Sequence, residues 1–193
     1  MFNKIKKNTY EKILRAAQDL IIKNPYHTVS LSMIAKKAGV TKAALYYYFR
    51  NKEELFLEIF KKMAESFKEE LNKHIKEELP PQENLKNFIV TYINFFFIKK
   101  NLIQILIQKV SKSNKKICSR LKGTREDIIS KLEKIMDKIL KDDKRKEEVS
   151  SRMAAMMILG MLGTFFIKHA YDKKTEISPE KIANKIINFL NFK

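Results

Sequence analysis

Lys42, Ala43, Ala44 and Tyr47 follow Thr41, a good N-cap residue, and so lie near the exposed start of a short predicted helix. Lysine and tyrosine at such a helix end can bind phosphates or the edges of bases. In a helix-turn-helix, the second helix presents this end to the DNA major groove. The chemistry that these residue types and their spacing predict is therefore recognition of DNA.

Two helical patterns separated by one tight turn position these residues. Ile34 and Ala35 give the first pattern an apolar face, and Leu45 and Phe49 give one to the second. Gly39 follows the first pattern, where a helix commonly ends in a left-handed backbone conformation. We therefore predict a helix-turn-helix between residues 31 and 50.

The flanking sequence resembles the DNA-binding domain of the TetR/AcrR family of bacterial transcriptional regulators. The matching pieces are Ile-Leu-Arg-Ala-Ala at 13–17, the segment 29–49 ending in Leu-Tyr-Tyr-Tyr-Phe, and Asn-Lys-Glu-Glu-Leu at 51–55. By this resemblance, Lys42 and Tyr47 approach bases or adjacent phosphates, and Thr41, Tyr46, Tyr48 and Lys52 hold the backbone. The whole DNA-binding set that we expect is Ser30, Ser32, Thr41, Lys42, Ala43, Ala44, Tyr46, Tyr47, Tyr48 and Lys52.

The resemblance implies a transcriptional repressor that works as a homodimer through its last two helices. It would bind a pseudo-palindromic double-stranded operator and leave it when a small hydrophobic effector binds. Two other interpretations stay open. One is a constitutive DNA-binding regulator of the same fold with a filled core, and the other is a helical scaffold or enzyme with a basic docking head.

Length and composition agree with an all-α protein. The chain has 193 residues, of which 45% are hydrophobic, with only four glycines and four prolines, and no stretch alternates as a strand. We expect a helix-turn-helix domain at 1–52 and a ligand-binding and dimerisation domain at 53–193.

The net charge of +18 is concentrated near the N-terminus. Residues 1–52 contain eleven lysines and arginines against two acids, whereas the remaining 141 residues contain 29 against 20. Such an excess would neutralise DNA phosphates and make the affinity for DNA depend on salt. Abundant lysine, isoleucine and asparagine throughout the chain are also typical of an AT-rich genome, which accounts for part of the excess.

The helix boundaries follow from periodicity and from proline and glycine positions. We expect a helix at 9–23 and a long one from Asn51 toward Leu79, stopped by Pro80 and Pro81. Further helical patterns cover 85–97, 102–110, 114–140 with a break near Gly123, 146–171 and 178–192.

A ligand pocket is expected inside the second domain, lined by apolar and aromatic side chains with a few polar anchors. The anchors are Tyr92, Asn94, Gln104 and Gln108. The other predicted pocket residues are Phe60, Met63, Phe67, Phe88, Phe96, Ile103, Leu106, Met157 and Phe165.

Residue types also indicate what the chain lacks. Its single cysteine, Cys118, fits the reducing cytoplasm. The three histidines lie in separate segments without metal-ligand spacing, so we expect no metal, cofactor or catalytic site. The uncharged run Met153–Ile167 is fifteen residues long, and because a membrane span needs about twenty, a buried helix is predicted.

Overall fold

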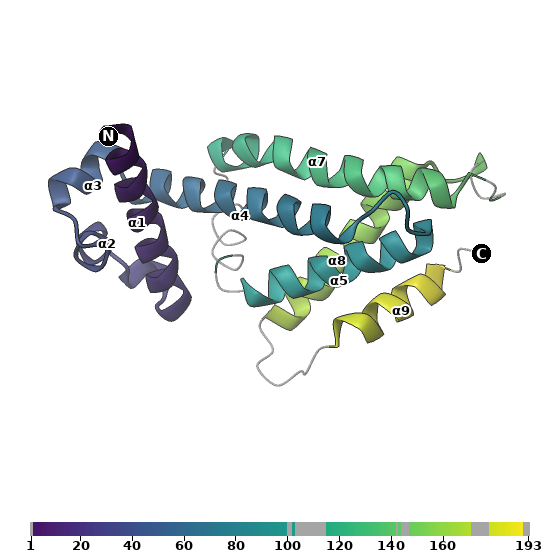
Figure 1. Cartoon of the computed structure of the whole chain (residues 1–193). Helices are drawn as coiled ribbons and strands as arrows, with labels where there is room; N and C mark the ends of the chain where they lie inside the picture. The colour runs from purple at the N-terminus through teal and green to yellow at the C-terminus, as the bar shows by residue number, and fades with distance from the viewer. Residues whose placement is uncertain are drawn as a thin grey trace. The chain divides into compact units, whose positions relative to one another are not determined.

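The structure is a computed structural model in which every described secondary-structure element is a helix (Figure 1). The helix positions bear out the predicted all-α fold class. The described residues are 2–99, 102, 115–141, 143, 147–170 and 178–190.

The chain forms two compact units. Of the described residues, the first unit contains 2–63, 102 and 115–117, and the second contains 64–99 and those from 118 onward. The boundary therefore lies inside helix α4 (Lys52–His74), later than the predicted boundary at residue 52. Leu55, Ile59 and Phe60 in the first half of α4 are buried. Their burial explains why this half of the helix belongs to the first unit, the predicted DNA-binding head.

The first unit is built from α1 (Phe2–Lys23), a 3₁₀ turn (Tyr26–Thr28), α2 (Leu31–Ala38), α3 (Lys42–Tyr48) and the start of α4. Helices α1 and α2 pack together, as do α2 and α3. Their apolar faces form the core predicted from the sequence. Its buried members include Ile13, Leu14, Ala17, Ile34, Ala35, Leu45 and Phe49.

Local capping fixes the turn between α2 and α3. The Ser30 hydroxyl accepts a hydrogen bond from the Met33 amide, and the Thr41 hydroxyl accepts one from the Ala44 amide at 3.0 Å. Gly39 has φ +66°, and the amides of Gly39 and Val40 donate to Lys36 and Ala35 in a Schellman motif. The predicted helix-turn-helix is thus confirmed down to its cap residues.

Asn51 and Glu54 start helix α4. The Asn51 side chain accepts from the Glu54 amide, and the Glu54 carboxylate accepts from the Arg50 amide. The helix ends at His74 and not near the predicted Leu79. The reason is that the buried Asn84 side chain, and not the next helical turn, forms hydrogen bonds with the backbone just after His74. Its amide exchanges hydrogen bonds with the backbone N–H and C=O of Lys76.

The second unit contains the rest of α4, α5 (Pro81–Ile98), α7 (Lys115–Ile139), α8 (Ser151–Ala170) and α9 (Pro179–Leu190). Helix α5 packs against α8 and α9, and α7 lies beside the second half of α4 (Figure 1). Helix α7 is continuous through Gly123, so the predicted break there was wrong. The predicted helix at 102–110 lies outside the described residues except for Leu102.

Helix α8 is apolar on both sides, but only one side is buried within the single chain, which corrects the expectation of a buried helix. Ala155, Ile158 and Leu162 are buried, whereas Met153 and Met157 are each 54% exposed. By length and composition alone, Ser151–Lys168 could cross a membrane, with a mean hydropathy of 1.3 and 28% of the stretch buried. The core helix of a soluble protein can have the same length and hydropathy. The exposed methionines form an apolar face that the rest of the chain does not cover.

Candidate nucleic-acid interface and ligand site

The exposed side of α3 is the candidate DNA-reading surface. Lys42 and Ala43 are exposed, Ala44 is half-buried, and Tyr46 and Tyr47 are 45% and 68% exposed. Ser30 and Ser32 of the preceding helix start are exposed as well.

Lys6 of α1 holds two of the predicted DNA-contact tyrosines. Its ammonium donates a hydrogen bond to the Tyr47 hydroxyl at 3.0 Å, and the Tyr48 hydroxyl donates to the Lys6 carbonyl at 3.1 Å. The hydrogen bond with Tyr47 raises the pKa of Lys6. Lys6 is not among the contact residues predicted from the sequence, where only the run of lysines near the N-terminus could have indicated it.

Lys52 is half-buried at the start of α4 and not simply exposed. Its ammonium donates to the Tyr26 carbonyl and lies 3.9 Å from the centre of the Tyr26 ring. These contacts hold the Lys52 side chain against Tyr26 in the first unit.

These features define a helix-turn-helix DNA-binding protein. The recognition helix is capped at its start and exposed on one side, and residues 1–52, about a quarter of the chain, carry half of its net charge of +18.

Aromatic rings fill the interior of the second unit. Phe67 lies 5.8 Å from Tyr92 and 5.3 Å from Phe96, measured between ring centres, and Tyr92 stacks on Phe96 at 4.1 Å. Phe88 and Phe95 join this cluster. Burial raises the pKa of Tyr92 to about 12, so its hydroxyl stays neutral at physiological pH.

The structure brings together only part of the predicted ligand set. Phe67, Phe88, Tyr92 and Phe96 form one cluster, and Phe165 lies 6.3 Å from Phe97. Phe60 and Met63 are buried in the first unit, and Met157 is exposed on α8. Ile103, Gln104, Leu106 and Gln108 lie outside the described residues. The sequence analysis missed Phe95 and Phe166, which meet the predicted aromatics through ring contacts.

Asn94 belongs to a different place, a surface hollow between α4 and α5. The hollow has a volume of about 490 Å³ and also contains Asn87, Thr91 and His74. Asn87, Thr91 and Asn94 of α5 therefore line this hollow, and Phe95 lines it as well as joining the ring cluster.

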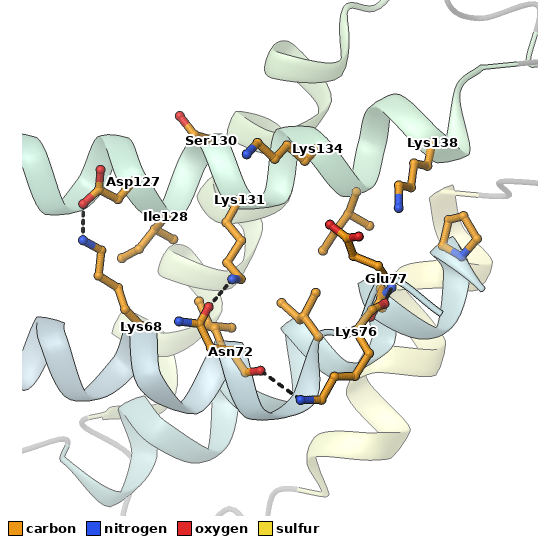
Figure 2. Close-up of a pocket in the computed structure, with 15 residues that line it drawn as sticks. Lys68, Asn72, Lys76, Glu77, Asp127, Ile128, Ser130, Lys131, Lys134 and Lys138 are labelled. Carbon is orange, nitrogen blue, oxygen red and sulfur yellow. Dashed lines mark hydrogen bonds and ion pairs between the residues drawn. The ribbon is translucent and has the colours of Figure 1, made fainter. Parts of the chain in front are cut away.

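A larger pocket of about 610 Å³ lies where α4 and α7 run side by side (Figure 2). Five lysines line it, from α4, α7 and the loop after α4, together with two acids, Glu77 and Asp127. Lys68 pairs with Asp127, and Lys131 donates to the Asn72 side chain. Among the described residues, no group of three or more histidine, cysteine or acidic side chains has the arrangement of a metal site.

Comparisons with known proteins agree with this class. The family described as "Bacterial regulatory proteins, tetR family" matches residues 13–59, and the "Tetracyclin repressor-like, C-terminal domain" matches residues 78–191. The chain belongs to the TetR family, and it is a helix-turn-helix transcriptional regulator.

Individual relatives fall within the same family. The chain is 29% identical to the fatty acid metabolism regulator protein of Bacillus subtilis over 159 residues, or 82% of each chain. It is 36% identical to the regulator QacR of Staphylococcus aureus over 81 residues, or 42% of each chain. The crystal structure of FadR from Bacillus subtilis in complex with stearoyl-CoA is similar with a TM-score of 0.78 and 25% identity, covering 94% of this chain and 97% of that one.

Proposed function

We propose that this regulator is a homodimeric repressor that binds a pseudo-palindromic operator and is released from it by a long-chain fatty acyl-CoA. The observation that supports DNA binding is helix α3, which is capped at its start and has Lys42 and Tyr47 on its solvent-exposed side. A regulator of bacterial genes acts in the cytoplasm, where the operator lies.

The proposed DNA contacts divide into two kinds. Lys42, Ala43, Ala44 and Tyr47 sit where an α-helix entering the major groove would meet base edges. Ser30, Ser32, Thr41, Tyr46, Tyr48 and Lys52 are proposed to bind the phosphate backbone, which positions the head without reading the sequence.

The proposed dimer uses helices α8 and α9. Met153, Met156 and Met157 of α8 and Phe189 of α9 expose large apolar side chains, with Phe189 at 79%. A Cβ placed on Gly160 or Gly163 would meet nothing within 4 Å inside the chain. Close approach of a second copy at these glycines would account for their presence in a helix interior, where each costs about 1 kcal/mol relative to alanine.

The effector is proposed from two observations. The second unit holds a large aromatic interior around Phe67, Tyr92 and Phe96, which suits an acyl chain. Two of the relatives reported above are a fatty acid metabolism regulator and a FadR in complex with stearoyl-CoA. Helix α4 has residues in both units, so an acyl chain that displaces Phe67 would act on the helix that begins at the head.

A constitutive repressor is the second candidate, and the ring contacts favour it. Tyr92 and Phe96 stack closely and Phe67 packs edge-on against both, so these rings fill the space between them. An acyl chain would have to separate them, at about 0.5–1.5 kcal/mol for each ring pair.

Gel-shift titrations with the intergenic DNA beside the chain's own gene distinguish the two candidates. We expect stearoyl-CoA to weaken operator binding by tenfold to a hundredfold, which requires a coupling of about 1.4–2.7 kcal/mol. Linkage demands that operator DNA weaken stearoyl-CoA binding by the same factor. Equal stearoyl-CoA affinity for free and DNA-bound protein would leave the constitutive repressor.

A further inference from the structure

The pocket between α4 and α7 carries more positive charge than its own acids balance. Lys68, Lys76, Lys131, Lys134 and Lys138 line it against Glu77 and Asp127. Because Lys68 and Asp127 pair with each other, four lysines remain around a single carboxylate. In the part of the chain that the structure describes, no salt bridge engages these four lysines.

The lining lysines come from both sides of the pocket, α4 with the loop after it and α7. Figure 2 shows Lys131 and Lys138 directed from α7 toward α4, with Lys76 and Glu77 on the opposite side. Asn72 lies between them and accepts hydrogen bonds from Lys131 through its side chain and from Lys76 through its carbonyl, the latter at 3.4 Å. Each bond uses one donor of its ammonium group and leaves that group with further donors.

Burial, and after it one neighbouring like charge, disfavours the protonated form of Lys131. Partial burial and the neighbouring Lys134 lower the pKa of Lys131. An anion in the pocket would remove this repulsion. Lysine ammonium groups are common phosphate ligands in proteins, since each offers a point charge and several donors.

The rest of the lining suits a small organic molecule. Leu71 and Ile135 are buried and form an apolar floor, and Ile75 and Ile128 flank it. The volume of about 610 Å³ is within the range of small-molecule sites. A bilayer or a DNA duplex would need an open charged face, and this recessed pocket with an apolar floor favours a compact ligand.

The first turn of α5 adds to the attraction for anions. Pro81 and Asn84 line the pocket, and the cap residue Pro80 makes no side-chain hydrogen bond to this turn. A helix start carries partial positive charge. Glu83, the acid of this turn, is exposed and is not among the pocket residues.

We propose that the α4–α7 pocket is an anion site that binds the phosphate groups of a small ligand through Lys76, Lys131, Lys134 and Lys138. Two sources share this chemistry. One is the nucleotide end of the proposed acyl-CoA effector, an assignment that rests on the proposed function, and the other is an independent phosphorylated metabolite.

Isothermal titration of the full-length protein with coenzyme A and with inorganic pyrophosphate tests the site. The Lys131→Gln/Lys134→Gln variant should bind both probes at least about tenfold more weakly than the unaltered protein. The matched control is Lys122→Gln/Lys141→Gln, which removes the same charge from exposed positions outside the pocket. Unchanged far-ultraviolet circular dichroism and unchanged operator binding without ligand would show that the variants are folded.

The outcomes separate this proposal from the proposed function. If stearoyl-CoA competes with pyrophosphate, the site serves the effector's own phosphates, and if both bind together it serves another metabolite. Pyrophosphate binding that depends on Lys131 and Lys134, without any effect of stearoyl-CoA on DNA, would support the anion site and reject the effector. The anion site would be overturned if both double variants bound coenzyme A and pyrophosphate equally well, or if the unaltered protein bound neither probe. Either result would count against the site even if stearoyl-CoA releases the protein from DNA.

Discussion

Lys42 and Lys52 have the same charge in different surroundings, and both are proposed DNA contacts. Lys42 is exposed at the start of α3, whereas Lys52 rests on the ring and carbonyl of Tyr26. If each neutralises one phosphate, Lys42→Ala or Lys52→Ala should reduce the slope of log affinity against log salt by about one. Fluorescence anisotropy with the operator at several salt concentrations measures this slope.

Lys61→Ala is the control for this experiment. It removes one positive charge from an exposed residue that pairs with Glu58 on α4, outside the proposed contact set. Its slope should equal that of the unaltered protein. A Lys52→Ala slope that matches the control would remove Lys52 from the contacts and leave it the structural role of holding Tyr26.

The partly buried Tyr92 makes stability depend on pH in alkaline solution. Its folded-state pKa is about 12 against an ordinary value of 10, because burial disfavours the phenolate. The raised folded value means that stability is fully present below pH 10 and falls as the pH rises toward 12. Between pH 9 and pH 11, Tyr92 should cost about 1 kcal/mol of unfolding free energy.

Urea unfolding at both pH values measures this loss, with Tyr92→Phe as the comparison. Since phenylalanine has no ionisable group, the variant should lose about 1 kcal/mol less than the unaltered protein over this interval. Equal losses would show that the Tyr92 hydroxyl reaches solvent.

At the scale of elements, Gly39 and Gly123 should respond oppositely to alanine. Gly39 has φ +66°, and a Cβ there would meet nothing within 4 Å, so Gly39→Ala should destabilise the head by about 1–2 kcal/mol through backbone strain alone. Gly123 is a helical residue of α7 with equal space, so Gly123→Ala should stabilise the protein by about 0.5–1 kcal/mol. Thermal unfolding of both variants checks the two signs, and a stabilising Gly39→Ala would contradict the strain argument.

Signals confined to a few neighbouring residues made the head predictable. Ser30, Gly39 and Thr41 each act on the backbone within five residues, so the sequence specifies both helices and their turn. The start of α4 is equally local, since Asn51 and Glu54 cap it together.

Contacts between distant residues account for what the sequence did not predict. The end of α4 depends on Asn84, whose side chain reaches back eight residues to Lys76. Lys6 lies 41 residues from Tyr47, and Lys131 lies 59 from Asn72. Periodicity indicates which face of a helix is apolar, but it does not indicate which distant polar group will contact that helix. Neither the Lys6 contacts nor the lysine-lined pocket could therefore be predicted from the sequence.

At the scale of the whole molecule, the apolar surface of α8 and α9 is the feature that one chain leaves open. Ala155, Ile158 and Leu162 bury one side of α8, and the exposed Met153 and Met157 lie on the other. Exposed large apolar side chains that cluster on one surface are typical of interfaces between subunits. This surface underlies the proposed homodimer.

Charges on this surface should therefore separate the subunits. We expect Met153→Glu/Met157→Glu to give monomers, because a dimer would bury both carboxylates without partners. Ile98→Glu is the matched control, since Ile98 is an equally apolar residue that is 79% exposed on α5, outside the proposed interface. Light scattering coupled to size-exclusion chromatography measures the mass of each variant.

The monomeric variant should also lose affinity for the full operator but not for a single half-site, because two linked heads bind two half-sites more tightly than one head binds one. A methionine variant that remains dimeric, or an unaltered protein that is a monomer yet binds the full operator tightly, would place the interface elsewhere or remove the dimer from the proposed mechanism.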